Sequence, residues 1–259
     1  MNTMHFSKRN RLTSVVLGFC LLFGVCVHAS ELEDALRTLQ QHIRGEKFLE
    51  DVAVETLTTT ITSHKDALRL DPAAIRAAQD VVTDFDIIHG PLWIKHAPLH
   101  QREKTPEDAT KWAIFWVMQH LFDTLYNNHG IMHHQEILEG FRFGSADHFP
   151  GVVAADPDPL AIHTVRINAS YPETWGAPVM HMERPARKPT GTYLVPGSIA
   201  TVTVPEALVN NGYQIRVGAH SWDHQNKPRV LRLYRVSAVY DITQSEMQVA
   251  NPLGGGDLY

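Results

Sequence analysis

Cysteine is almost absent from this sequence. The 259 residues include 2 cysteines, Cys20 and Cys26, and both lie within the first thirty positions. If that segment is removed on export, the remaining chain has no thiol. We therefore expect it to contain no disulfide, no cysteine nucleophile and no cysteine-ligated zinc.

The short motifs of several common enzyme classes are also missing. The H-E-x-x-H pattern of zinc peptidases does not occur among the 259 residues, and neither do G-x-S-x-G, the P-loop or G-x-G-x-x-G. Each of these patterns places a nucleophile, a metal ligand or a phosphate cradle at a fixed spacing. Without them the chain shows no complete catalytic apparatus, and we assign it no catalytic residue and no metal ligand.

Long apolar runs are confined to the N-terminus. After residue 30 there is no stretch of 18 apolar residues, which a membrane-spanning helix would need. Before it, three basic residues precede an apolar run over 15–27, which ends at an A-x-A-like site, Val27-His28-Ala29. This pattern predicts a signal peptide over residues 1–29, with a retained anchor as the alternative. We expect the mature protein to be secreted or periplasmic, without a transmembrane segment.

A surplus of basic residues is lacking too. The sequence has 23 Lys and Arg against 28 Asp and Glu, and three of the basic residues lie in the predicted signal peptide. Cleavage would leave 20 basic and 28 acidic residues, a net charge of −8. An acidic surface is repelled by the phosphate backbone, so we expect no nucleic-acid partner.

Helical periodicity is present throughout the first half of the chain. Apolar residues recur at helical spacing over 31–43, and Gly45 gives a stop signal; a weaker helix is predicted over 48–70. Asp71 is a good N-cap and Pro72 a good first helical residue for a third helix, which should end before Gly90. We expect a helical domain over residues 30–147.

The strongest helical pattern begins at Thr105-Pro106, in a stretch that extends to Gly130. Its large apolar residues cover most of the helix circumference: Trp112, Phe115, Trp116, Leu121, Phe122 and Leu125. A helix that is apolar nearly all round is expected in the middle of a helical bundle. An aromatic stripe for sugar binding is a less favoured alternative.

Histidine is abundant, with 16 residues, and two groups invite a metal interpretation. The first contains His129, His133, His134 and Glu136. Two histidines one turn apart bind an ion only on a continuous helix, and Gly130 between them predicts a helix end. We therefore favour a polar helix junction and keep a metal site in the helical half as an alternative.

The second group is His220, Asp223 and His224. These residues follow a predicted strand and lie in a polar segment, where three potential ligands on one loop are a weak signal for a metal. We favour a solvated loop between strands over a metal site.

The composition changes near Phe149. Residues 148–188 are rich in Pro and Gly and predict a linker with one short strand over 161–168. From residue 189 the apolar pattern has a period of two, which predicts antiparallel strands; these fall within 192–205, where Pro196-Gly197 forms a turn, and within 212–220 and 229–242. The expected fold is α+β, a helical bundle followed by the start of an antiparallel β-sandwich-like domain over 189–259.

The β half resembles a known family at specific positions. The family pattern T-G-x-[YW]-x-x-P-G-x-x-x-x-V-x-[VI]-P is matched by Thr190, Gly191, Tyr193, Pro196, Gly197, Val202 and Pro205. A strand core follows at Gln214, Ile215, Val217, Gly218 and Ala219, and A-N-x-x-G-G-x-[IL]-Y is matched by Ala250, Asn251, Gly254, Gly255, Leu258 and Tyr259. These segments are similar to the opening of the peptidase domain in enhancin-like, mucin-degrading zinc metallopeptidases. More loosely, the helical half resembles the N-terminal region of bacterial immunomodulating metalloproteases.

The resemblance implies an activity for the family and a limited role for this chain. Complete members would hydrolyse peptide bonds in mucin-type O-glycoproteins, using zinc held by an H-E-x-x-H helix that lies downstream of the segments matched here. We therefore expect this chain to be the exported N-terminal portion of such an enzyme, truncated within the peptidase domain and inactive alone. Zinc is expected for the full-length member and not for this chain, and a glycoprotein or mucin is the expected partner.

Three residues are candidates for substrate binding. Gly254 and Gly255 belong to the matched glycine segment, which is expected to continue as a strand to Tyr259, and Trp222 lies in a predicted loop. The alternative function is a stand-alone secreted protein that binds glycans or a host surface, in which Trp175 and Trp222 stack on sugar rings.

Overall fold

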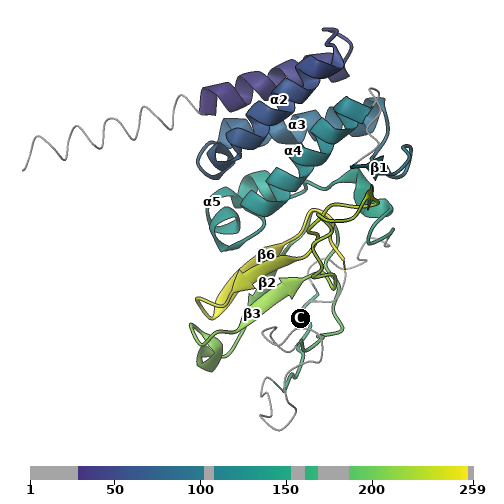
Figure 1. The fold of residues 1–259 in the computed structure, drawn as a ribbon. Coiled ribbons are helices and arrows are strands. Elements are labelled where there is room, and N and C mark those ends of the chain that lie inside the picture. Colours follow the sequence, from purple (N-terminus) through teal and green to yellow (C-terminus); the bar gives the residue numbers. More distant parts are fainter. Residues whose placement is uncertain (1–28, 102–107, 153–160, 169–186, 256–259) are drawn as a thin grey trace, which may run out of the picture.

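The structure is a computed structural model that describes residues 29–101, 108–152, 161–168 and 187–255. Figure 1 shows a layer of helices above a layer of short strands. We call the described residues 29–152 the helical unit and residues 187–255 the β unit. The α+β class is confirmed, whereas the predicted domain boundaries, the bundle and the sandwich stay predictions.

The helical unit begins with a helix over residues 29–43, and Gly45 follows it with a φ of 72°. The other helices are α2 (Asp51–Ser63), α3 (Pro72–Ile88), α4 (Ala109–Leu125) and α5 (Asn128–Leu138), with the 3-10 turns η1 (Lys65–Arg69) and η3 (Gly144–Asp147). The predicted start of α3 is confirmed. The Asp71 side chain accepts a hydrogen bond from the Ala73 N–H at 2.8 Å, and Pro72 is the first helical residue.

Helix α4 is the centre of the helical unit, as its apolar circumference predicts. It packs against α2, α3, η1 and α5, and its residues from Trp112 to Phe115 are all buried. The predicted cap at Thr105 lies outside the described residues; the residue before the helix is Asp108, whose side chain makes no cap bond. Burial on all sides follows from a helix that has no polar face.

The prediction that Gly130 ends a helix is wrong. Gly130 lies in the first turn of α5, and the chain turns instead at Asn127, whose side chain accepts hydrogen bonds from the His129 and Gly130 N–H groups at 3.0 and 3.1 Å. A Cβ atom on Gly130 would lie 1.9 Å from the Leu125 carbonyl oxygen. Glycine is therefore needed for the close approach of α5 to the end of α4, not for a helix stop.

The described strands pair in three antiparallel two-stranded sheets. They are β1 (Leu99–His100) with β4 (Arg229–Val230), β2 (Ile199–Thr203) with β6 (Glu246–Ala250), and β3 (Gln214–Val217) with β5 (Ala238–Asp241). A 3-10 turn, η5 (Glu206–Leu208), follows β2. The β1–β4 sheet joins a strand of the helical unit to one of the β unit.

Several strand predictions need correction. Residues 161–168 form no strand and are exposed, since an isolated extended segment without a pairing partner has no ladder to stabilise it. The turn at Pro196-Gly197 is confirmed, with a φ of 83° at Gly197, but the strand before it is reduced to a bridge at Tyr193. The segment 229–242 forms two strands rather than one, because the residues between β4 and β5 bond to the helical unit instead.

Buried polar side chains connect the small sheets of the β unit. The Tyr240 hydroxyl on β5 donates to the Ala250 carbonyl at 2.7 Å and accepts from the Ala250 N–H at 3.1 Å, which ties β5 to β6. The Asn251 amide donates to the carbonyls of Val217 and Val236, both at 3.0 Å. Both side chains are fully buried, so these bonds replace water for backbone groups that no ladder satisfies.

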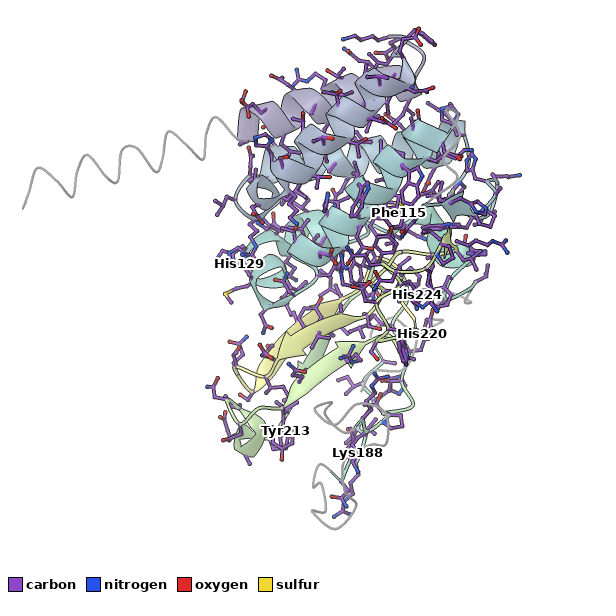
Figure 2. The ribbon with its side chains drawn as sticks, in the orientation of Figure 1. Phe115, His129, Lys188, Tyr213, His220 and His224 are labelled. Atoms are coloured by element: carbon purple, nitrogen blue, oxygen red, sulfur yellow. The ribbon has the colours of Figure 1, made fainter. Side chains whose placement is uncertain are left out.

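One apolar core runs through both units. Phe115 of α4 lies at the junction (Figure 2) and packs edge-on against Tyr234 of the β unit, with ring centroids 4.7 Å apart. The Asn128 side chain donates to the Asp241 carbonyl and accepts from its N–H, both at 2.8 Å, in the manner of a paired strand residue. The two units are therefore docked by specific contacts. No helix of the described part of the chain is long and apolar enough to cross a membrane.

Candidate functional site

A surface cleft of about 270 Å³ lies where the end of α4 meets the β unit. Helix α4 contributes one wall, and β3, β5 and the loops beside them contribute the others. The lining residues are Phe122, Asp123, Tyr126, Arg216, His220, Ser221, Trp222, Arg235, Val236, Ser237, Ala238 and Val239. One of the three predicted substrate-binding residues, Trp222, is therefore part of the cleft.

Trp222 lies on the loop that follows β3. Its side chain is 51% exposed, although tryptophan is usually buried. The loop itself is anchored: Arg187 donates to the Ala219 carbonyl at 2.8 Å and also bonds the Ser221 hydroxyl, and Ser237 donates to the His220 carbonyl at 2.7 Å. The indole is therefore about half exposed, on a segment whose backbone is anchored.

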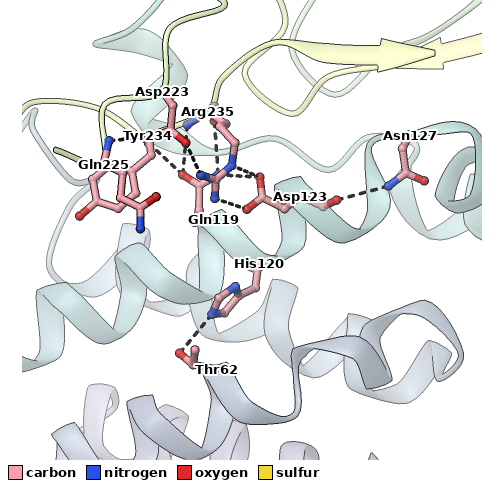
Figure 3. Close-up of polar contacts among 9 residues, drawn as sticks. All are labelled: Thr62, Gln119, His120, Asp123, Asn127, Asp223, Gln225, Tyr234 and Arg235. Carbon is pink, nitrogen blue, oxygen red and sulfur yellow. Dashed lines mark hydrogen bonds and ion pairs between the residues drawn. The ribbon is translucent and has the colours of Figure 1, made fainter. Parts of the chain in front are cut away.

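Arg235 forms the polar side of the cleft, and Figure 3 shows its hydrogen bonds. Its Nε and Nη2 atoms donate to the two oxygens of Asp123 at 2.9 and 2.5 Å, and its Nη1 atom donates to Asp223 at 2.9 Å. The bonds to Asp123 raise the pKa of the guanidinium above its usual value. Gln119 fixes the same carboxylate by donating to Asp123 Oδ1 at 2.9 Å. The Arg235 fork is thus held in one orientation.

The apolar wall consists of two stacked rings on the helical unit. Phe122 and Tyr126 have centroids 5.9 Å apart and ring planes 20° apart. The Tyr126 hydroxyl is buried and has no hydrogen-bond partner among the residues that the structure describes. Burial raises its pKa well above the usual value, so the hydroxyl stays protonated and remains a potential donor.

The second histidine group does not converge on one point. Asp223 bonds Arg235 and the Gln225 N–H, the latter at 2.8 Å; His224 Nε2 lies 2.9 Å from Arg232 Nη2; and His220 packs on another ring, that of Phe149. Burial, followed by the charge of Arg232, lowers the pKa of both histidines. These side chains support the loop and do not form a joint ligand set.

The first histidine group lies on α5, which is broken not at Gly130, as predicted, but by a kink at His134, where φ is −131° and ψ is 21°. The rings of His129 and His133 stack at 4.3 Å with planes 10° apart, so they face each other rather than a common point. His134 Nε2 bonds the Arg69 carbonyl at 2.9 Å. Across the described ranges, no group of three or more His, Cys, Asp or Glu residues is placed to hold a metal ion.

Gly254 and Gly255 are buried and lie against the other matched segment of the β unit. Their φ angles are 57° and 55°, in the left-handed region, so the chain does not continue as a strand here as predicted. A Cβ atom on Gly254 would lie 2.3 Å from the Pro196 nitrogen, and one on Gly255 would lie 2.7 Å from the Tyr193 hydroxyl. Both glycines therefore permit close packing of the two segments. Their predicted role in substrate binding stays a prediction.

Sequence reasoning missed Asp123 and Arg235, which fix the polar side of the cleft. One signal was available: Asp123 is an acidic residue near the end of a helix that is otherwise apolar nearly all round. Its partner Arg235 lies 112 residues away and gave no comparable signal. Trp175, the other predicted sugar-stacking residue, lies outside the described residues.

Comparison with known proteins gives one finding. The family described as the N-terminal domain of M60-like peptidases matches residues 161–256. The match includes the β unit, β3, β5 and the Trp222 loop, and excludes α4. No match was found among curated proteins or among solved structures. Over residues 161–256, the resemblance to the N-terminal part of the M60-like, or enhancin-like, peptidase family is therefore confirmed.

Proposed function

We propose that this chain contributes the non-catalytic N-terminal part of an exported M60-like zinc peptidase that acts on O-glycosylated proteins of the mucin type. The observation that carries the proposal is the family match over residues 161–256. Export is supported by the basic and apolar pattern of residues 1–29. The docked helical unit then positions the β unit beside its substrate.

Zinc does not fit the residues that this chain offers. The sequence contains no H-E-x-x-H motif, and the described residues include no group of three potential ligands. We therefore assign no step of peptide hydrolysis to these residues. Their part in the reaction is to fold the N-terminal domain and to contact the glycoprotein.

The test compares the natural product with the isolated chain. An antibody against residues 30–147 captures the protein from culture fluid of the source cells, and the captured material is incubated with submaxillary mucin. We expect zinc-dependent cleavage that EDTA stops and added zinc restores, whereas the recombinant 259-residue chain leaves mucin intact. Recovery of the protein only from the cell interior would contradict export.

A second function is favoured by the cleft at Trp222. In this alternative, the chain is a stand-alone secreted protein that binds glycans or a host surface. Captured material that retains mucin on the antibody without cutting it would support this alternative and overturn the peptidase proposal. Material that neither binds nor cuts mucin would overturn both.

A further inference from the structure

The cleft between α4 and the β unit combines two kinds of surface. An exposed indole, Trp222, offers flat apolar contact, and the buried, stacked rings of Phe122 and Tyr126 complete the apolar lining. Beside them, the Arg235–Asp123 pair offers polar groups in one plane. Small-molecule sites have this composition, with a mostly apolar and aromatic lining and a few well-placed polar groups.

The charges of the cleft argue against a small ion as its ligand. Arg235 faces two carboxylates, Asp123 and Asp223, so its positive charge is already compensated. Each carboxylate is in turn occupied by the guanidinium. An anion would be repelled by the two carboxylates, and a cation would be repelled by the Arg235 guanidinium. At the Arg235–Asp123 pair the ligand group that fits is therefore neutral, and the second arginine of the lining, Arg216, lies apart from this pair in the chain, on β3.

Hydrogen-bonding capacity nevertheless remains at this pair. Bonds to described residues use three of the five N–H groups of Arg235, and the Oδ2 atom of Asp123, which receives one bond from these residues, can accept another. A ligand that carries several hydroxyl groups could donate to Asp123 and accept from Arg235 at the same time.

The size of the cleft limits the ligand to about one ring. Pockets for drug-sized ligands measure roughly 300–1,000 Å³, and this cleft holds about 270 Å³. Its open side, where Trp222 is exposed, would let the rest of a larger molecule extend into solvent.

We propose that this cleft binds a single neutral sugar ring, a hexose or an N-acetylhexosamine. One apolar face of the ring lies on the Trp222 indole, and its hydroxyl groups bond Asp123 and Arg235. The proposal deepens the proposed function and rests on it for the source of the sugar, an O-linked glycan on the substrate protein. The helical unit and the β unit each supply part of the site, so the docking of the two units creates it.

The experiment titrates the full chain with four free sugars: galactose, N-acetylgalactosamine, glucose and N-acetylglucosamine. Binding is followed by saturation-transfer NMR and by tryptophan fluorescence. We expect saturable binding of at least one sugar, a loss of at least tenfold in affinity for Trp222→Ala, and substantial retention of binding for Trp222→Phe. Asp123→Asn should also weaken binding severalfold, with circular dichroism confirming that each variant is folded.

Tyr213→Ala provides the matched control. Tyr213 is an aromatic residue that is 38% exposed and precedes β3, whereas the Trp222 loop follows β3 (Figure 2). Because Tyr213 lies at the other end of the strand, Tyr213→Ala should leave the affinity for the sugar unchanged. The absence of transfer from all four sugars, or equal affinity in wild type and Trp222→Ala, would overturn the site. If captured protein still cleaves mucin in that case, the proposed function stands without the site. Sugar binding without any mucin cleavage would retain the site and reject the function.

Discussion

The helical unit and the β unit are stabilised in different ways. In the helical unit, α2, α3 and α5 bury apolar faces against α4. These four helices have 11 to 17 residues, and each forms because an apolar pattern repeats along its sequence. Strands of the β unit have only two to five residues, and single side chains such as Tyr240 and Asn251 hold them together. The helical unit thus depends on buried area, and the β unit on individual hydrogen bonds and on docking.

This contrast has a consequence for folding. A two-stranded sheet is at best marginally stable in water, so the β unit needs the apolar surface of α4 to support it. The reverse dependence is weaker, because α4 also packs on α2, α3 and α5. Substitutions at the junction should therefore affect the β unit more than the helical unit.

The largest effect is expected at the junction itself. Phe115 is fully buried and touches the rings of Trp112, Trp116 and Tyr234. Phe115→Ala should lower the free energy of unfolding by about 4 kcal/mol, from lost burial and the cavity left behind. Urea unfolding measures the loss of stability. The rate of amide hydrogen exchange should increase more in β5 and β6 than in α3. An equal increase of the exchange rate in all three elements would show that the β unit does not depend on the junction more than the helical unit does.

The next effect tests the dependence of the β unit on single side chains. Asn251→Ala removes two bonds to buried carbonyls and one from the Leu253 N–H, and it leaves those groups without partners. We expect a loss of about 3 kcal/mol. Gln79→Ala is the control in the helical unit, since its side chain donates one bond, to the Ile137 carbonyl, and is only partly buried. Thermal unfolding of the two variants gives the comparison.

A smaller effect separates backbone strain from close packing in the β unit. Gly254 and Gly191 both have positive φ, at 57° and 74°, but a Cβ atom meets the Pro196 backbone only at Gly254 and nothing within 4 Å at Gly191. Gly191→Ala should cost about 1 kcal/mol from strain alone. Gly254→Ala should cost about 1 kcal/mol more than that, from the displacement of Pro196. Equal losses in chemical denaturation would show that the two segments are not tightly packed.

The smallest effect concerns pH and the helical unit. His120 of α4 is buried beside Thr62, and burial lowers its pKa to about 4. The unfolded chain takes up this proton at a higher pH, so the stability His120 contributes is present above about pH 6.5 and is lost as the pH falls towards 4. Between about pH 7 and pH 5 we expect this loss to be about 2 kcal/mol, and His120→Gln should flatten the pH dependence of urea unfolding over this range.

Asp86 changes the stability with pH in the direction opposite to His120, so its contribution must be measured separately. Burial raises its pKa to about 6, so its contribution to stability is present below about pH 4 and is lost as the pH rises through 6. Asp86→Asn keeps an acceptor for the Gly144 N–H, which donates to Asp86 at 2.9 Å. In the Asp86→Asn background, the acid sensitivity due to His120 should be steeper than in wild type; an unchanged slope would show that the pKa of Asp86 does not differ between the folded and unfolded chains.

The two units also differ in how far the sequence predicts them. The helices are predictable because α3 and α4 repeat their apolar pattern over 17 residues, and the cap at Asp71 is local. Gly130 was misread because its requirement comes from the Leu125 carbonyl of the neighbouring helix, which residue preference does not reveal. The segment 161–168 has a strand-like pattern, but pairing is decided by a partner elsewhere in the chain.

The candidate site was predictable only in part. Trp222 was identified because an aromatic residue in a polar loop is conspicuous by itself. The ion pair of Asp123 and Arg235 depends on how α4 docks on the β unit. A contact between residues 112 positions apart leaves no pattern in the neighbouring sequence. The resemblance located Gly254 and Tyr193 separately, and the structure shows why both belong to one pattern: their segments pack against each other.

The position of α4 bears on how this protein can be divided and recombined. Similarity to the peptidase family begins at residue 161, yet the domain so defined bonds α4 through the Tyr234 N–H, which donates to Gln119 at 2.9 Å. A boundary drawn at residue 161 therefore passes through a shared interior. Chimeras that exchange the matched region between relatives should carry residues 109–152 with it, so the inherited unit is larger than the region of recognisable similarity.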